Sequence, residues 1–275
     1  MKRTLFLFFV LLSFSFNAFG QNNHLNLKSQ SAFILNAQNG HVVYDKNADK
    51  VAPIASITKL MTAMVVLDAR LSPNDIITID NADVDKLKHT ASRLRVGSGY
   101  PRHELLRLTL MSSENRAAAA LARTYPGGTT AFVNAMNRKA QQIGMQNSRF
   151  VDSTGLSSDN VSTARDLAKL VAASNRYAVI RDFSTTSQHS VSAANKRGQL
   201  QYVNSNSLVR NQNWEIDVSK TGYLSEAGRC LVMQANISGQ PVVIVLLNSW
   251  GKNTRIGDAN RIKKWLESNQ YRKQV

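Results

Sequence analysis

The chain has 275 residues, and its 34 Lys and Arg against 18 Asp and Glu give a formal net charge of +16 at pH 7. This length is ample for one sizeable hydrophobic core and close to the upper limit for a single domain. The single cysteine, Cys230, excludes an internal disulfide, and its apolar, strand-like surroundings predict a buried, unreactive thiol.

Residues 1–20 have the features of a cleaved signal peptide. Lys2 and Arg3 form a basic start, an apolar run follows, and Ala18-Phe19-Gly20 provides a small-residue cleavage site. A membrane-spanning helix needs ~20 apolar residues, which neither this run nor any later stretch supplies. We therefore expect residues 21–275 to form one exported, periplasmic domain without a transmembrane segment.

The positive charge is spread along the chain, with no basic tract and no interleaved aromatic residues. An exported protein seldom meets nucleic acid, so we expect no nucleic-acid partner. An anionic polymer of the cell envelope explains the charge better, and a weak association with a membrane surface stays open.

The first predicted elements are two strands and a helix. Ser31–Leu35 and His41–Tyr44 are joined through Asn39-Gly40, which is a strong hairpin signal. Ala52–Arg70 predicts a buried helix, because Pro53 can stand ahead of the first turn and apolar residues fill most of two faces.

Ser56 and Lys59 are three residues apart, so their side chains share one side of the first turn of this helix. The start of a helix would stabilise an oxyanion at Ser56. A free lysine titrates near ~10.4, but burial beside another cation could lower its pKa by ~3–5 units and let it take the serine proton. The simpler alternative is a serine N-cap beside a surface lysine, because Ser-x-x-Lys also occurs by chance, as at Ser249–Lys252.

The middle of the chain predicts mainly helices. The predicted elements are the strand Ile76–Ile79 within the exposed, acidic Asn74–Lys88, the loop Ala91–Tyr100 and the helices Glu104–Met111, Arg116–Ala122, Thr129–Ile143 and Ala164–Ala173. Ser162 or Thr163 can cap the last of these helices. The polar Ser184–Asn206 predicts either a surface loop or a short strand pair beside a cleft.

Three strands and a helix end the chain. They are Trp214–Ser219, Arg229–Ser238, Pro241–Ser249 and the amphipathic helix Arg255–Asn269, whose Ile256, Ile262, Trp265 and Leu266 should face the sheet. With the first two strands they predict an α/β fold. One antiparallel five-stranded sheet, built from both chain ends, is flanked by helices, and the middle forms an all-helical subregion.

Three short motifs follow one another along the chain. They are Ser56-x-x-Lys59, Ser113-x-Asn115 between two helices, and Lys220-Thr221-Gly222 after the strand Trp214–Ser219. This order is typical of penicillin-binding serine peptidases and β-lactamases. With Pro53–Ala63, Phe150–Leu170 and Lys220–Tyr223, the chain resembles the low-molecular-mass D-alanyl-D-alanine peptidases over nearly its whole length after the leader. The resemblance implies a β-lactamase/DD-peptidase-like fold.

The resemblance implies catalytic roles for three residues and a supporting role for a fourth. Ser56 would be the nucleophile and Lys59 its base, while Ser113 would pass a proton to the leaving nitrogen. Asn115 would hold Lys59 and contact the amide of the substrate.

The resemblance also implies a substrate-binding strand. Lys220 and Thr221 would bind the terminal carboxylate, and the Lys220 cation would help to keep Lys59 neutral. Gly222 would let the substrate backbone lie close to the strand edge, and the N–H groups of Tyr223 and Ser56 would form an oxyanion hole. Arg255 is either a second carboxylate-binding arginine or an ordinary solvated residue at a helix start.

Competing motifs are less convincing. Ser158-Asp159-Asn160 repeats the second motif but falls in a segment that the family places elsewhere. The five histidines lack metal-ligand spacing, there is no Gly-x-Ser-x-Gly elbow, and no glycine loop suits a phosphate, so we expect neither a metal nor a cofactor.

The motifs do not decide which of several related reactions the protein catalyses. No glutamate lies between Phe150 and Asn175, where a class A β-lactamase holds its deacylating water, so we expect β-lactams to acylate Ser56 and remain. The chain leaves no residues for the C-terminal β-domain and anchor of longer carboxypeptidases, and it resembles endopeptidases of the penicillin-binding protein 7 type. Those cut cross-links between peptidoglycan stem peptides. A carboxypeptidase and a non-catalytic peptidoglycan-binding protein are the alternatives.

Overall fold

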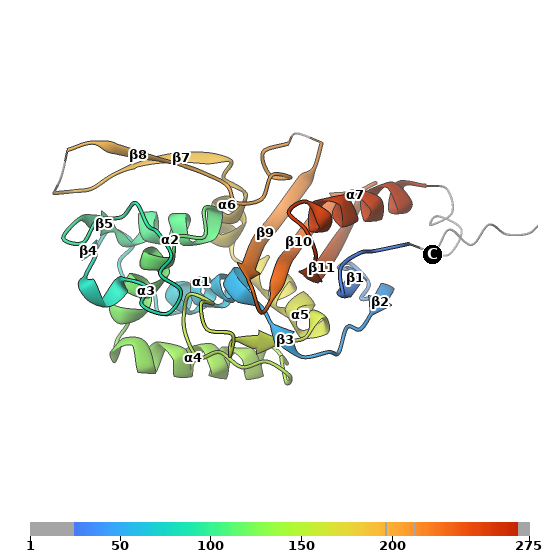
Figure 1. Ribbon diagram of the computed structural model, residues 1–275, viewed down its shortest axis with the longest axis horizontal. Helices are drawn as coiled ribbons and strands as arrows, with labels where there is room; N and C mark the ends of the chain where they lie inside the picture. The colour runs from blue at the N-terminus through green and yellow to red at the C-terminus, as the bar shows by residue number, and fades with distance from the viewer. Residues whose placement is uncertain (1–24, 196, 212, 269–275) are drawn as a thin grey trace, which may run out of the picture.

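The structure is a computed structural model that describes residues 25–195, 197–211 and 213–268 (Figure 1). The predicted leader lies outside the described residues. One five-stranded antiparallel sheet has the strand order β2-β1-β11-β10-β9, so both ends of the chain contribute to it, as the sequence predicted. Its strands are β1 (Ser31–Asn36), β2 (Val42–Lys46), β9 (Glu215–Leu224), β10 (Gly228–Ile237) and β11 (Gln240–Ser249).

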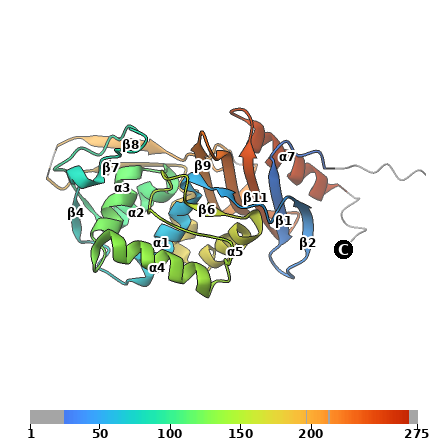
Figure 2. The ribbon, with the colours of Figure 1, turned by 60° about the horizontal axis from the view of Figure 1, so that its bottom comes forward.

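The central strands β10 and β11 are buried on both faces, because helices cover each side of the sheet (Figures 1 and 2). Helix α7 (Thr254–Glu267) packs Ala259, Ile262 and Leu266 against one face, and Ile256 and Trp265 lie at the border of this cluster, which confirms the predicted apolar side. On the other face, α5 (Ala164–Ser174) packs against β1 and β11. The thiol of Cys230 is fully buried on β10, and burial raises its pKa to about 11.

The predicted all-helical subregion surrounds α1 (Thr58–Asp68). Every residue from Thr58 to Val66 is buried, so most of this helix has no solvent face and its sequence is apolar nearly all round. The surrounding helices are α2 (Arg102–Met111), α3 (Asn115–Arg123), α4 (Gly128–Gln142) and α6 (Ala178–Thr185). The short α6 was not predicted, since its eight residues bury only Ile180, Phe183 and Ser184 and give a weak periodic signal.

Short elements connect these layers. They are β3 (Ala52–Pro53), the 3₁₀ turns η1 (Ala55–Ile57) and η2 (Asn81–Asp83), β4 (Ile76–Thr78), β5 (Gly99–Pro101) and β6 (Val161–Ser162). The end of the predicted loop Ala91–Tyr100 is therefore a strand, because Gly99–Pro101 pairs with β4. The segment Asn74–Lys88 is not wholly exposed either: Asp83 is buried and accepts two hydrogen bonds from Arg123 at 2.9 Å.

One strand is longer than its sequence indicated. The motif Lys220-Thr221-Gly222 was expected after a strand that ends at Ser219, but it lies inside β9. Its residues pair along β10 in an unbroken register from Ser219 opposite Met233 to Leu224 opposite Gly228. The hydrogen bonds and packing of a buried neighbouring strand thus outweigh the polar character of the motif. Because β9 is the edge of the sheet, its outer side pairs with no other described strand.

The polar segment Ser184–Asn206 forms a strand pair rather than a plain loop. Strands β7 (Gln188–Ser192) and β8 (Gln199–Val203) make a hairpin that lies on the opposite side of the helical subregion from α4 (Figures 1 and 2). On β7, His189 shares a hydrogen bond of 2.6 Å with Glu104 of α2, which ties the hairpin to the helices. Across the described residues, no helix combines the length and apolar character needed to span a bilayer.

Candidate active site

Ser56 lies on the 3₁₀ turn η1, immediately before α1. Neither η1 nor α1 has a side-chain N-cap hydrogen bond, so the simpler explanation of Ser56 as an N-cap is wrong. The preceding residue, Ala55, has a φ of +48°, a left-handed conformation that L-residues rarely adopt. This strained turn places a partly exposed hydroxyl beside the buried start of the helix.

Lys59 is fully buried, and its amine is held by three groups. Nζ donates to Oγ of Ser56 at 2.9 Å, to Oδ1 of Asn115 at 2.7 Å and to the carbonyl oxygen of Thr154 at 2.5 Å. The predicted Ser56, Lys59 and Asn115 therefore meet at one nitrogen atom. The Thr154 carbonyl belongs to the backbone, so no residue type in the sequence could have indicated it.

Burial lowers the pKa of Lys59 to about 7. Desolvation is the main cause, and the more distant carboxylates of Asp152, Glu114 and Asp85 partly oppose it. Among the described residues, none of these acids lies within ion-pair distance of the amine. A substantial fraction of Lys59 is then neutral near neutral pH and can accept a proton from the Ser56 hydroxyl.

A second buried amine faces Ser113. Nζ of Lys220 donates to Oγ of Ser113 and to the carbonyl oxygen of Thr221, both at 2.9 Å. Ser113 stands between α2 and α3 with a φ of +63°, another left-handed conformation at a non-glycine residue. The loop between the two helices thus turns its hydroxyl toward the sheet, as the order of motifs predicted.

The resemblance implied a positive charge on Lys220, and its surroundings make that charge costly. Its side chain is about as buried as that of Lys59. Its pKa is well below its ordinary value, first because of desolvation and second because of the charge on Lys59. Two buried amines that repel each other's protons favour a state in which at most one of them is charged.

The remaining residues of β9 have separate surroundings. The hydroxyl of Thr221 shares a hydrogen bond of 2.8 Å with Oγ of Ser205, a residue that the sequence analysis missed. A side chain at Gly222 would put its Cβ 3.1 Å from the Ser56 nitrogen and from Ala55 Cβ. Glycine is therefore favoured at this position because β9 packs closely against η1. Tyr223 is 58% exposed, and the Arg229 guanidinium lies 4.5 Å from its ring centre.

Arg255 does not behave like an ordinary solvated residue at a helix start. It is partly buried near Arg229, and desolvation and that like charge lower its pKa. One nitrogen donates to the Lys252 carbonyl at 3.2 Å, while the buried Nε has no partner in the described part of the chain. Two neighbouring guanidinium groups beside β9 and β10 favour a bound anion.

The rival motif Ser158-Asp159-Asn160 has a structural role. Asn160 is fully buried, accepts from the backbone N–H of Val151 and donates to Asp152 at 2.7 Å. Asp152 in turn accepts from the backbone N–H groups of Thr154, Gly155 and Ser157. These hydrogen bonds hold the loop so that the Thr154 carbonyl accepts from Lys59. No residue of Ser158-Asp159-Asn160 is a hydrogen-bond partner of Lys220.

A second supporting network was also missed. Nδ2 of Asn115 donates to Oγ1 of Thr90 at 2.9 Å, and Thr90 donates to Asp85 at 2.7 Å. On the same loop, Lys88 pairs with Glu226 at 2.5 Å, in the turn between β9 and β10. The loop therefore fixes Asn115 and also contacts the sheet. These residues stand in a polar segment without helical or strand periodicity, so no sequence pattern pointed to them.

An α/β sheet with an all-helical subregion, and a Ser-x-x-Lys pair facing a Ser-x-Asn loop and a Lys-Thr-Gly strand, defines a serine peptidase of the penicillin-recognising class. The model of the family described as "D-alanyl-D-alanine carboxypeptidase" matches residues 18–251. The chain belongs to this family.

Curated relatives and solved structures agree with this assignment. A D-alanyl-D-alanine endopeptidase of Pseudomonas aeruginosa is 48% identical over 89% of this chain and 79% of its own length. One of Escherichia coli is also 48% identical, over 88% of this chain and 78% of its own. The crystal structure of the Streptomyces K15 DD-transpeptidase superposes with a TM-score of 0.81 and 29% identity, covering 87% of this chain and 97% of the other.

We predict that acylation by penicillin rises with pH through the pKa of Lys59. Below about pH 7 the amine is protonated and cannot take the hydroxyl proton, so the rate should fall about tenfold for each pH unit in the acid limb. Stopped-flow measurements of acylation from about pH 5 to pH 9, with circular dichroism as a check on folding, provide the test. A flat profile across this range would contradict the assignment of Lys59 as the base.

Two alanine substitutions should separate the contact between the Asp152 loop and η1 from the backbone strain that any side chain causes at a positive φ. Gly155 and Gly40 both have positive φ values, of +78° and +75°, but a Cβ at Gly155 would lie 2.0 Å from the Ala55 carbonyl oxygen, while one at Gly40 meets nothing within 4 Å. Gly155→Ala should lower the free energy of unfolding by more than about 2 kcal/mol and slow acylation at least about tenfold. Gly40→Ala should cost only about 1 kcal/mol and leave acylation unchanged. If the two variants were acylated at the same rate, the Asp152 loop would not be needed to position η1.

Proposed function

We propose that this protein is an exported serine D-alanyl-D-alanine endopeptidase that hydrolyses the D-alanyl cross-links of peptidoglycan through an acyl-enzyme on Ser56. The observation that carries the proposal is the buried Lys59 amine, 2.9 Å from the Ser56 hydroxyl and with a pKa of about 7. The two 48% identical relatives named D-alanyl-D-alanine endopeptidase support the choice of substrate.

In the proposed acylation, Oγ of Ser56 attacks the carbonyl carbon of D-alanine and its proton passes to Nζ of Lys59. The N–H groups of Ser56 and Tyr223 donate to the oxyanion of the tetrahedral intermediate. When the C–N bond breaks, Ser113 gives its hydroxyl proton to the leaving nitrogen and recovers one from Lys220. The contact between β9 and η1 at Gly222 supports this geometry, because it brings the two backbone N–H donors into neighbouring segments.

The two lysines suggest how substrate binding activates the serine. A carboxylate bound beside Lys220 and Thr221 stabilises a proton on Lys220. A charged Lys220 then opposes a second charge on Lys59, so that Lys59 becomes the neutral base. We propose that Arg255, whose Nε lacks a partner in the described residues, contributes to holding the same carboxylate. Asn115 would keep Lys59 in place and contact the substrate amide.

A carboxypeptidase is the second candidate, and the family description "D-alanyl-D-alanine carboxypeptidase" favours it. Both reactions share the acylation step and differ only in the leaving group, which is free D-alanine for the carboxypeptidase and the amine of a second stem peptide for the endopeptidase. A non-catalytic peptidoglycan-binding protein is less favoured, since a binding protein has no need of a buried neutral amine beside a hydroxyl.

We further propose that the protein acts in the periplasm on an anionic wall polymer, which suits its net charge of +16 better than nucleic acid does. The sequence of residues 1–20 supports export. Any contact with a membrane surface would be weak and electrostatic.

Digestion of a purified cross-linked dimer muropeptide tests the reaction. We expect monomers, because hydrolysis of the D-alanyl cross-link separates the two stem peptides. Release of D-alanine alone, with the dimer intact, would favour the carboxypeptidase instead.

Serine variants test the site with an internal control. Ser56→Ala should abolish both digestion and labelling by fluorescent penicillin, and Ser113→Ala should lower the rate of digestion by about 10²–10⁴-fold. Ser158→Ala alters the serine of the rival motif, which is not among the hydrogen-bond partners of Lys59 or Lys220, and should retain wild-type activity. Full labelling of Ser56→Ala would exclude Ser56 as the nucleophile.

Penicillin should remain bound after acylation. The acids between Phe150 and Asn175 offer no base for deacylation, because Asp152 and Asp166 accept several hydrogen bonds from the protein and Asp159 is exposed. Mass spectrometry of the acylated protein over hours should therefore show a persistent adduct. Rapid release of hydrolysed penicillin would instead indicate a β-lactamase.

A further inference from the structure

A cavity of about 230 Å³ opens where the tip of the β7–β8 hairpin meets the loop before β5. Three arginines, Arg93, Arg95 and Arg197, stand around it, and none of the described residues that line it is acidic. Its floor carries the buried Ser98 and Tyr100, whose hydroxyl groups can donate hydrogen bonds. This cavity lies outside the network of Ser56, and nothing in the proposed acylation uses it.

The walls of the cavity are fixed by the protein itself. The Arg93 guanidinium stacks 3.8 Å from the ring centre of Tyr202 and donates to the carbonyl of Gln201 on β8. At the hairpin tip, Asn195 accepts from the Gly99 N–H at 2.9 Å and donates to the Gly97 carbonyl at 2.8 Å. The cavity is therefore largely formed before any ligand arrives, which lowers the entropic cost of binding.

The positive charge around the cavity is not neutralised. Arg95 and Arg197 are exposed, and neither forms an ion pair with any acid of the described chain. Burial raises the pKa of Tyr100, and the nearby carboxylate of Glu114 adds to this rise. That carboxylate is itself buried and caps α3 by accepting from the N–H of Arg116. Three guanidinium groups facing one buried carboxylate leave a net attraction for anions, and guanidinium groups bind carboxylates in a bidentate manner.

Strand β8 leads from this cavity to the active site. Gln199 and Leu200 line the cavity, and the chain then runs through β8 to Ser205, which bonds to Thr221. An extended chain rises about 3.3 Å per residue, so the six steps from Gln199 to Ser205 cover about 20 Å. A peptide of about six residues beside this strand can therefore reach both places.

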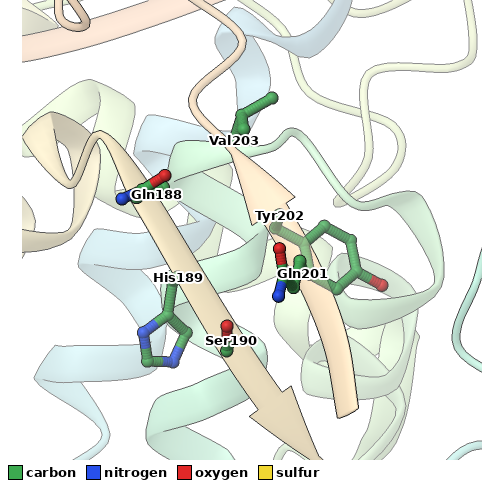
Figure 3. Close-up of a pocket in the computed structure, with 6 residues that line it drawn as sticks. All are labelled: Gln188, His189, Ser190, Gln201, Tyr202 and Val203. Carbon is green, nitrogen blue, oxygen red and sulfur yellow. The ribbon is translucent and has the colours of Figure 1, made fainter.

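A neighbouring cavity on the same hairpin makes a useful contrast. It has about 480 Å³ and is lined by side chains of β7 and β8 that carry no arginine or lysine, namely Gln188, His189, Ser190, Gln201, Tyr202 and Val203 (Figure 3). Its one ionisable imidazole, on His189, is already paired with Glu104. Of these two cavities on the hairpin, only the one at its tip is therefore expected to attract an anion.

We infer that the arginine-lined cavity binds a free carboxylate of the second stem peptide in a cross-linked substrate, up to about 20 Å along the chain from the Ser205–Thr221 pair. This inference rests on the proposed function and adds a determinant of substrate choice. A single stem peptide that ends at the active site need not reach the cavity, whereas a cross-linked pair can. The cavity then favours cross-linked peptidoglycan through binding alone, without any part in the chemistry.

The test compares two double variants that lose equal charge. Arg95→Gln with Arg197→Gln removes both unpaired guanidinium groups of the cavity. Arg138→Gln with Arg149→Gln removes two exposed arginines that form no ion pair in the described part of the chain. Arg138 lies on α4, on the opposite side of the helical subregion from the hairpin, and Arg149 pairs through its backbone with Val161 of β6. Both are assayed with purified cross-linked dimer muropeptide and with the same dimer after its carboxylates are amidated.

The cavity variant should raise the KM for the dimer about tenfold with kcat changed less than about twofold, because only binding common to ground and transition states is lost. The ratio of its KM to that of wild type should fall to about one on the amidated dimer or at high salt. The control variant should match wild type, and all three proteins should be labelled by fluorescent penicillin at the same rate.

An unchanged KM in the cavity variant, an equal rise in the control, or the same rise on the amidated dimer would each overturn the inference. Failure of the proposed function has a different result, since wild-type protein would then leave the dimer uncut.

Discussion

Two lysine amines without a carboxylate partner are buried next to each other, and the rest of the site follows from this constraint. Removing an ammonium group from water is costly unless the charge is paired or the proton is given up. Lys59 and Lys220 have hydroxyl, amide and carbonyl groups as hydrogen-bond partners instead of acids. These partners can accept from an ammonium or a neutral amine, so the site tolerates a moving proton in a way that a fixed ion pair would not.

The fold holds these amines by fixing the turn before α1 from two sides. Gly222 of β9 and Gly155 of the Asp152 loop both approach η1 so closely that a Cβ at either position would meet its backbone. The strained φ value of Ala55 is maintained by this packing, as is usual for backbone strain at a functional site. The residues with strained φ values, Ala55 and Ser113, precede or carry the two hydroxyl groups of the site.

The same core serves relatives with different names, which include endopeptidases, carboxypeptidases and a DD-transpeptidase. Acylation of a serine is compatible with each of these reactions, so the choice between them depends on what binds beyond the scissile bond. In this chain, the edge strand β9 and the hairpin β7–β8 are the two elements that can contact an extended substrate. Both elements bury core residues such as Val218 and Tyr202 and expose polar side chains beside them.

The sequence by itself determined the elements with strong periodicity and identified the motif residues that the fold places together. The buried helix after Ser56, the sheet built from both chain ends and the face of α7 that carries Ile262 all follow from local apolar patterns. The order of Ser56, Lys59, Ser113, Asn115 and Lys220 also sufficed to select these residues from rivals such as Ser158.

Only the tertiary structure decided what surrounds these residues. The Thr154 carbonyl on Lys59, the hydroxyl pair of Ser205 and Thr221, and the extension of β9 through Lys220 depend on contacts between segments far apart in the chain. The lowered pKa of Lys220 likewise follows from burial and from the neighbouring Lys59, which no local pattern specifies. No residue type in the sequence predicts a contact with a backbone group or the exclusion of solvent, because both arise from packing and not from side-chain identity.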